Sequence, residues 1–482
     1  MYLNQNQIDQ IVDKVVTRLQ PPQVDLTPNK PSYVAPSQWV SVKSEKKRKG
    51  VFSNIDEAIA AAEVAYHRFV RTTLENRNQI ITSVRKKCKE HIEKLSTMAQ
   101  EETGLGRALD KITKNKLVIE KTPGTEILVP YARTGDFGLV LEERASYGVI
   151  GSITPCTNPT ETIINNGIGM IAGGNAVVFN PHPQARNVSA YCVEIINDAI
   201  VEAGGPENLI STVDNPTIES AQALMKHKAI RLLVVTGGGG VVKEAMASGK
   251  KTIAAGPGNP PVLVDETADI DRAGRHIMKG ASLDNNIICI AEKETIVVDS
   301  VADKLIAAMK KYNCHIALPT QIKELEQVIL DSNRKPNKKF IGKNANVILK
   351  EIGVEAGDDV RLVVCEVEKE HPFVQEEMMM PVMPVVRVQN FEEGVMVAQQ
   401  AEHGYKHTAV IHSLNIDHLH HMACVMNTSI FVKNSPSYGG LGYGGEGYTS
   451  FTIASPTGEG MTNAVDFTRK RRCTLKGHFR IV

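Results

Sequence analysis

The chain has 482 residues, with 55 lysines and arginines against 54 aspartates and glutamates, and a formal net charge of +1 at pH 7. This length is about three times that of a typical domain, so we expect two or three structural units around sizeable cores. The balanced charge provides no global field toward nucleic acid or an anionic membrane, which excludes both as partners and leaves small molecules or proteins.

The eight cysteines are scattered, with no CxxC pair and no spacing typical of a metal site. We therefore expect neither a disulfide framework nor a bound metal, and a reducing, cytoplasmic environment. No stretch approaches the roughly 20 apolar residues that span a bilayer, and the first residues do not resemble a secretory signal. The sequence predicts a soluble protein that is not secreted.

The first 20 residues predict an amphipathic helix. Apolar residues recur on one face, at Ile8, Ile11, Val12, Val15, Val16 and Leu19. The helix ends at Pro21-Pro22, and the proline-rich residues 21–44 predict an extended linker. The periodicity leaves two interpretations open: the helix folds back onto the globular body, or residues 4–19 dock in a groove of another protein.

Residues 54–98 have a helical pattern, and from Val149 short β-branched runs alternate with helical patterns. Strands are predicted at 149–154, 176–179, 232–236 and 261–264, and helices at 187–203 and 242–247. This alternation predicts a parallel sheet in a doubly wound, nucleotide-binding α/β domain. The run Gly237–Gly240 follows a strand and precedes a helix, as a phosphate-binding loop does, but it lacks the full GxGxxG pattern. A flexible turn stays an equal alternative.

Five segments carry a family resemblance. They are Thr154-Pro-Cys-Thr-Asn158-Pro, Phe179-Asn-Pro-His-Pro183, Thr236-Gly-Gly-Gly-Gly240, Asn286-Ile-Ile-Cys289 and Gln375-Glu-Glu-Met-Met-Met-Pro-Val382. In this order, and from about Asn54 to the C-terminus, the chain resembles the aldehyde dehydrogenase superfamily. It is most similar to the CoA-acylating propionaldehyde and acetaldehyde dehydrogenases of bacterial microcompartments, which also begin with a short targeting helix and a linker. The resemblance implies docking of residues 4–19 on a shell or cargo protein, in the lumen of such a compartment.

The same resemblance implies the domain organisation. Residues 45–128 and 148–257 correspond to a Rossmann-type NAD-binding domain, and residues 258–464 to an α/β catalytic domain that carries the thiol. Residues 129–147 and 465–482 correspond to a β oligomerisation arm, so a homodimer or homotetramer is implied. The basic run Arg469–Arg472 in this arm is taken as a solvated face.

Two catalytic residues follow from the resemblance. Cys289 corresponds to the nucleophile that adds to the aldehyde carbonyl and then carries the acyl group as a thioester. Asn158 corresponds to the amide that, with the backbone N–H of Cys289, stabilises the oxyanion. Without the companion segments, Cys289 would be interpreted as a buried core residue.

The resemblance also implies a cofactor site. Glu377 corresponds to the residue that holds the nicotinamide ribose, and the predicted cofactor-binding set is completed by Thr154, Pro155, Asn180, Pro181, His182, Thr236, Gly237, Gly238 and Gly256. At Asn180 hydrolytic relatives have a lysine that binds the adenosine ribose. Its replacement predicts a weaker hold on the adenosine end and a preference for NAD, with NADP as the alternative.

The departures from the family predict the product. Hydrolytic members carry a glutamate base where Ala254 stands here, so the thioacyl enzyme would persist until a better nucleophile than water, the thiol of CoA, attacks it. CoA would enter by the cleft that NADH leaves, in a ping-pong sequence. Two alternatives stay open: hydrolytic oxidation with Glu292 or Glu377 as base, and an inactive cargo or scaffold protein.

Several other features have ordinary explanations. Cys156 is left unassigned, and His418 and His421 are interpreted as solvated or capping residues without a metal. The run Met378–Met380 is either core or cofactor wall. The glycine-rich residues 438–447 are either a lid over the substrate or a loop.

Overall fold

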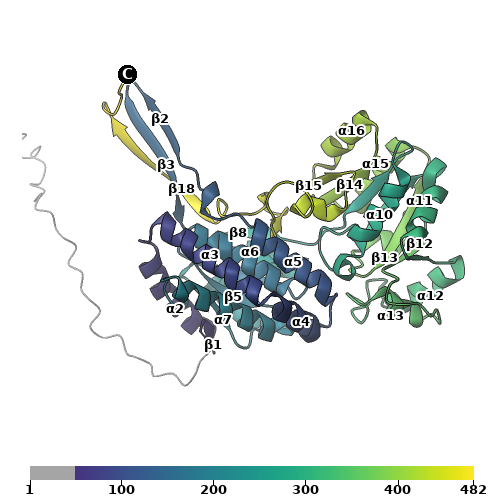
Figure 1. The fold of residues 1–482 in the computed structure, drawn as a ribbon, viewed down its shortest axis with the longest axis horizontal. Helices are drawn as coiled ribbons and strands as arrows, with labels where there is room; N and C mark the ends of the chain where they lie inside the picture. The colour runs from purple at the N-terminus through teal and green to yellow at the C-terminus, as the bar shows by residue number, and fades with distance from the viewer. Residues whose placement is uncertain (1–48) are drawn as a thin grey trace, which may run out of the picture. The chain divides into compact units, whose positions relative to one another are not determined.

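The structure, a computed structural model that describes residues 49–482, is built around two parallel β-sheets and a small antiparallel one (Figure 1). The predicted docking helix and linker of residues 1–44 lie outside the described residues. Among residues 49–482, no helix is both long and apolar enough to cross a membrane.

The first sheet has the strand order β1-β6-β5-β4-β7-β8, and all neighbours are parallel. Its strands are β1 (Val51–Phe52), β4 (Val149–Thr154), β5 (Ala176–Pro181), β6 (Ile210–Val213), β7 (Ile230–Thr236) and β8 (Lys251–Ala255). Every residue of β4, β5 and β6 is buried, as expected of a parallel sheet covered on both faces. The associated helices are α2 (Ile55–Phe69), α3 (Leu74–Glu90), α4 (Ile92–Thr103), α5 (Ala108–Lys121), α6 (Pro159–Ala172), α7 (Arg186–Glu202), α8 (Ile218–Lys226) and α9 (Gly239–Met246).

The second sheet has the order β11-β12-β13-β10-β9-β14-β15 and is also parallel throughout. Its strands are β9 (Pro261–Val264), β10 (Glu294–Val298), β11 (Cys314–Ile316), β12 (Leu362–Glu366), β13 (Val382–Val388), β14 (Thr408–His412) and β15 (Ile430–Lys433). Its helices are α10 (Ile270–Ala281), α11 (Asp299–Lys311), α12 (Pro319–Ile329), α13 (Ala345–Lys350), α14 (Pro372–Gln375), α15 (Phe391–Ala401) and α16 (Ile416–Met426).

The third sheet is the antiparallel order β18-β3-β2, made of β2 (Tyr131–Gly135), β3 (Gly138–Ser146) and β18 (Thr468–Lys476). β18 pairs with β3 along its whole length, from Thr468 opposite Ser146 to Lys476 opposite Gly138. Most residues of β2 and β18 are exposed, so this sheet forms an arm outside the two larger sheets (Figure 1). The two segments that the sequence assigned to an arm therefore pair with each other.

The predicted elements agree with the structure in type and approximate position. The strands predicted at 149–154 and 261–264 coincide with β4 and β9, and the helix predicted at 187–203 is α7. The helical residues 54–98 are divided among α2, α3 and α4, because Thr73 caps α3 with its side chain and His91 interrupts the helix after it. Two strands and two 3₁₀ helices, β16 (Ile453–Ala454), β17 (Gly460–Met461), η3 (Leu283–Asn286) and η4 (Ser437–Leu441), complete the part that concerns the site.

Candidate active site

The topology brings the predicted site residues to two sheet edges. Thr154, Pro181 and Thr236 end β4, β5 and β7, at the carboxyl edge of the first sheet, where open α/β sheets bind ligands. Cys289 and Glu377 instead precede β10 and β13, at the amino edge of the second sheet. The chain passes from one edge to the other between β8 and β9.

The segment before Cys289 has an unusual backbone that its sequence explains. Asp284, Asn285 and Asn286 adopt φ values of 48°, 53° and 68°, the left-handed region that Asn and Asp tolerate best after glycine. The Asn285 amide donates to Gly342 O at 2.8 Å. The Asn286 amide donates to Ala281 O at 2.8 Å and to Glu292 O at 2.9 Å. Side-chain hydrogen bonds thus fix the loop that presents the thiol.

Cys289 is half-buried, and Lys293 lies beside its loop. The Lys293 ammonium is buried and donates to both Asn286 O and Asn286 Oδ1 at 2.7 Å. Burial raises the pKa of Cys289 to about 12, the charge of Glu377 acts in the same direction, and Lys293 and Lys114 oppose it. At neutral pH these surroundings favour the protonated thiol over the thiolate.

Asn158 lies at the position before α6, where Pro159 opens the helix, and it is buried. Its Oδ1 accepts a hydrogen bond from Lys114 Nζ at 2.5 Å. Within residues 49–482, the one hydrogen bond of its amide nitrogen is to Thr157 Oγ1, at 3.2 Å. The carbonyl end of the amide is therefore occupied, and the NH₂ end keeps a donor for another acceptor.

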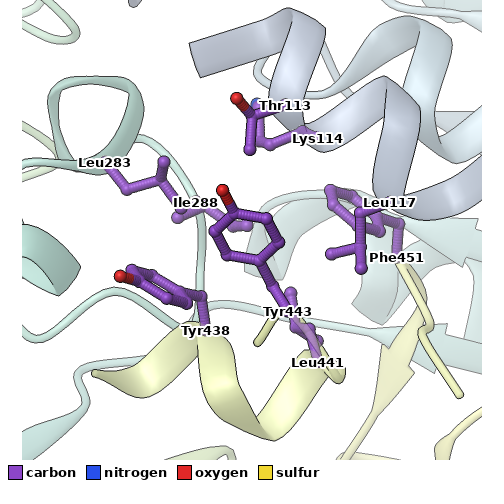
Figure 2. Close-up of a pocket in the computed structure, with 9 residues that line it drawn as sticks. All are labelled: Thr113, Lys114, Leu117, Leu283, Ile288, Tyr438, Leu441, Tyr443 and Phe451. Atoms are coloured by element: carbon purple, nitrogen blue, oxygen red, sulfur yellow. The ribbon is translucent and has the colours of Figure 1, made fainter. Parts of the chain in front are cut away.

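A small apolar pocket lies next to the neighbours of these two residues (Figure 2). It is lined by Thr113, Lys114, Leu117, Leu283, Ile288, Tyr438, Leu441, Tyr443 and Phe451. Its free volume of about 10 Å³ is room for about one water molecule. Ile288 precedes Cys289 in the chain, and Lys114 donates to Asn158, so both predicted residues have a direct neighbour in the pocket wall. The glycine-rich residues predicted as lid or loop supply one wall, through Tyr438 and Tyr443.

The carboxyl edge of the first sheet has the features of a dinucleotide site. α9 begins at Gly239 with Gly238 as its cap residue, and a Cβ at Gly238, Gly239 or Gly240 would meet no atom within 4 Å. Open amides at a helix N-terminus suit a pyrophosphate. Thr154 is 1 % exposed, and its hydroxyl has no hydrogen-bond partner among the described residues. These residues fit the NAD that the sequence predicts.

Other residues of the predicted cofactor set differ in whether their side chains already have hydrogen-bond partners. Asn180 is 3 % exposed, and its Oδ1 accepts from Ser220 Oγ at 2.6 Å. Thr236 Oγ1 lies 2.8 Å from Thr452 Oγ1. Burial lowers the pKa of His182, which keeps its ring neutral. The side chain of Asn180 thus already has a partner, which agrees with a weaker hold on the adenosine ribose.

Glu377 and a residue that the sequence analysis did not identify, His407, lie against Gly258. Burial raises the pKa of Glu377, opposed by Lys293 and by a hydrogen bond from the Gly258 N–H. A Cβ on Gly258 would lie 2.8 Å from His407 Cγ, so only glycine fits there. His407 is 1 % exposed, its Nε2 has no partner in the described chain, and burial lowers its pKa to about 4. The one feature of the sequence that could have identified His407 is its position just before strand β14, at the sheet edge that carries Cys289.

Glu292, which with Glu377 is one of the two alternative bases, is bound to another segment of the chain. It is fully buried, and its oxygens accept from Ser437 N at 2.8 Å and Ser437 Oγ at 2.7 Å. It therefore anchors η4, and each of its oxygens already has a partner. Ala254 is buried within β8, and its N–H donates to Thr457 Oγ1 at 3.0 Å.

Two of the other features can be placed in the structure. Met378 and Met380 are at most 1 % exposed and belong to the core beneath β12 and β13, so they are core residues. The interpretation of His418 as a solvated or capping residue is wrong: its Nδ1 lies 2.7 Å from the carboxylate of buried Asp265, its ring stacks on Phe391, and Asn415 caps the helix. Among residues 49–482 no group of three His, Cys, Asp or Glu side chains is placed to hold a metal ion.

Known proteins with similar sequences and structures identify the family. The aldehyde dehydrogenase family model matches residues 46–463. Acetaldehyde dehydrogenase (acetylating) EutE of Salmonella typhimurium is 46 % identical over 486 residues, which cover 100 % of both chains. Propionaldehyde dehydrogenase of Rhodopseudomonas palustris, solved with bound CoA and an acylated cysteine, is 46 % identical with a TM-score of 0.88, covering 89 % of this chain and 98 % of that one.

A third relative comes from a microcompartment. The propionaldehyde dehydrogenase of the Clostridium phytofermentans fucose utilisation bacterial microcompartment is 47 % identical with a TM-score of 0.89, and the match covers 90 % of this chain and 100 % of that one. These findings confirm the resemblance and the fold class that the sequence predicted. The chain belongs to the aldehyde dehydrogenase family.

Proposed function

We propose that this protein oxidises a short aliphatic aldehyde with NAD and transfers the acyl group to CoA, through a thioester on Cys289. The observation that carries this proposal is the loop of Cys289, fixed by the Asn286 amide, beside an apolar pocket that is lined by Ile288, the neighbour of Cys289, and by Lys114, the partner of Asn158. Relatives named as acetylating enzymes, and one solved with CoA and an acylated cysteine, support the CoA step. Chromatographic identification of acyl-CoA or free acid as the product tests it.

The residues divide the first half-reaction among them. The Cys289 sulfur bonds to the aldehyde carbon as its thiol proton passes to solvent, and the carbonyl oxygen becomes an oxyanion. The Asn158 NH₂ and the Cys289 N–H donate to that oxygen where its charge develops. NAD, when bound, supplies the acceptor for the hydride that leaves the same carbon as the carbonyl of the thioester forms. Glu377 and the open amides of Gly238–Gly240 would hold the cofactor.

The second half-reaction depends on the absence of a base that activates water. Ala254 provides no carboxylate where hydrolytic relatives have a base, and both oxygens of Glu292 are held by Ser437. Water near the thioester is therefore not activated by either residue. The sulfur of CoA attacks the acyl carbon, the bond to Cys289 breaks, and the free thiol returns.

The apolar pocket limits the length of the aldehyde. Leu441 is 1 % exposed and forms one wall (Figure 2). Leu441→Ala should raise kcat/KM for hexanal relative to acetaldehyde by about 10- to 100-fold, since each methylene accommodated changes binding by about 1–3 kcal/mol. Steady-state kinetics with the two aldehydes measure the ratio.

A matched control separates pocket size from stability. Leu325→Ala removes an equally buried leucine from α12, in the other core cluster, and should lower stability by about 2–5 kcal/mol without changing the aldehyde preference. An unchanged preference in Leu441→Ala would mean that the acyl chain lies elsewhere.

The arm is proposed to join subunits. In the order β18-β3-β2 the outer strands leave unpaired backbone edges, which proteins normally cover. A homodimer or homotetramer that pairs or packs these arms is the arrangement that the sequence predicted. Light scattering of the purified protein measures the subunit number.

Residues 4–19 are proposed to dock on a shell or cargo protein in a bacterial microcompartment. Their apolar stripe and the microcompartment origin of a relative support this. Deleting residues 1–20 should leave kcat within about twofold and abolish co-purification with the compartment, because docking and catalysis use separate segments. Lost turnover would instead show that the segment is part of the fold.

A further inference from the structure

A buried cluster of four charges underlies the oxyanion amide. Lys111, Lys114, Asp284 and Glu161 have side chains at most 2 % exposed. Lys111 pairs with Asp284 Oδ2 at 2.9 Å, and Lys114 pairs with the same oxygen at 2.5 Å and with Glu161 Oε1 at 3.1 Å. Two positive and two negative charges balance, as a buried cluster requires.

Lys114 has one contact that the rest of the cluster lacks. Its ammonium also donates to Asn158 Oδ1 at 2.5 Å, in addition to its ion pairs with Asp284 and Glu161. An ammonium donates and cannot accept, whereas an asparagine amide can turn its carbonyl or its NH₂ toward a partner. The contact therefore fixes the orientation of the Asn158 amide.

The neighbouring carboxylates favour the charged form of Lys114. Burial by itself lowers the pKa of Lys114, but the charges of Asp284 and Glu161 outweigh it, and the net effect is a raised pKa. The ammonium that donates to Asn158 is therefore stabilised by the same cluster that holds it in place. The same Asp284 accepts from Arg107 N at 2.7 Å and begins the left-handed run before Cys289, so one cluster fixes both the amide and the nucleophile's loop.

We infer that Lys114 is a positioning residue for catalysis: it holds Asn158 with its NH₂ toward the developing oxyanion. The inference rests on the proposed function, because it assigns that role to Asn158. Lys114 acts through the amide, so its removal lowers kcat by misorienting Asn158 and leaves aldehyde binding in the apolar pocket almost unchanged.

The test is a double-mutant cycle with a matched control. Lys114→Met should lower kcat for CoA-dependent NADH formation by about 10- to 100-fold, with the KM for aldehyde changed less than about threefold. The double variant Lys114→Met/Asn158→Ala should be within about threefold of Asn158→Ala alone, because the lysine has no amide left to orient. Asn115→Ala removes a buried polar group from the same helix, where its amide donates to Ser96 Oγ, and should keep kcat within about threefold.

Each outcome has a distinct meaning. Independent, multiplicative losses in the double variant, or an equal loss in Asn115→Ala, would overturn the inference and leave the proposed function standing. Full activity of Asn158→Ala would overturn both. If Lys114→Met does not fold, two charge-balanced double variants replace it, Lys114→Met/Asp284→Asn and Lys111→Met/Asp284→Asn. Only the first should lose the contribution of the Asn158 amide to kcat. Equal kcat values in the two double variants would overturn the inference.

Discussion

Replacing Cys289 with alanine should lower kcat for CoA-dependent NADH formation by at least about 10⁴-fold. The sulfur forms the bond that holds the acyl group through both half-reactions, and no other described side chain replaces it on the fixed loop. The loss should be one of chemistry alone, because alanine fits the space of a half-buried thiol. Absorbance of NADH with propionaldehyde, NAD and CoA measures it.

Cys156→Ala is the matched control for that loss. Cys156 is also a half-buried free cysteine, and it lies on the loop that leads to Asn158. Because no role is assigned to its thiol, kcat should stay within about threefold. Turnover that persists in Cys289→Ala, or vanishes in Cys156→Ala, would mean that the nucleophile has been misassigned.

Asn158→Ala should lower kcat by about 10²- to 10³-fold, the usual effect of removing one oxyanion donor. The donor acts mainly on the charge that develops in the transition state, so the KM for aldehyde should change little. Steady-state kinetics at saturating NAD and CoA measure the separation of kcat from KM.

Asn115→Ala provides a control on the neighbouring helix. Asn115 is a fully buried amide of α5 that donates to Ser96 Oγ at 3.1 Å, outside the active site. The Asn115→Ala substitution should lower the free energy of unfolding by about 1–3 kcal/mol and leave kcat within about threefold of the unsubstituted protein. If Asn158→Ala behaved in the same way, the amide would be structural, and the oxyanion would be stabilised by other groups.

The strands of the fold could be predicted because their sequence patterns are local. The apolar runs of β4 and β9 are bounded by turn residues, and burial on both faces keeps them continuously apolar. The order of the strands could not be read from them. It depends on crossovers that place β9 between β10 and β14, contacts between segments far apart in the chain.

In the candidate site, too, residues in local sequence motifs could be proposed from the sequence, whereas residues placed by long-range packing could not. Cys289, Asn158 and Glu377 stand in short recognisable segments, so the sequence was enough to propose them as site residues. Lys114 could not, because it lies in an ordinary helical pattern and its role arises only where α5 packs against the start of α6 and the loop of Asp284. His407 was missed for a similar reason, since its place beside Gly258 depends on β14 pairing with β9.

Glu292 illustrates how a residue type can mislead. A glutamate three residues after the nucleophile is a reasonable candidate base in sequence. In the structure both of its oxygens bind Ser437, and burial raises its pKa to about 7. Its partner comes from a segment 145 positions away, so the sequence alone gives no sign that the carboxyl group is already bound.

The most direct test of the account is a pre-steady-state measurement of NADH formation from propionaldehyde and NAD in the absence of CoA. We predict a burst of about one NADH per Cys289, then almost no further turnover, and acyl-CoA release with steady turnover once CoA is added. Sustained NADH formation with free acid as product and no CoA would contradict the account, because water would then be activated despite Ala254 and the bound Glu292.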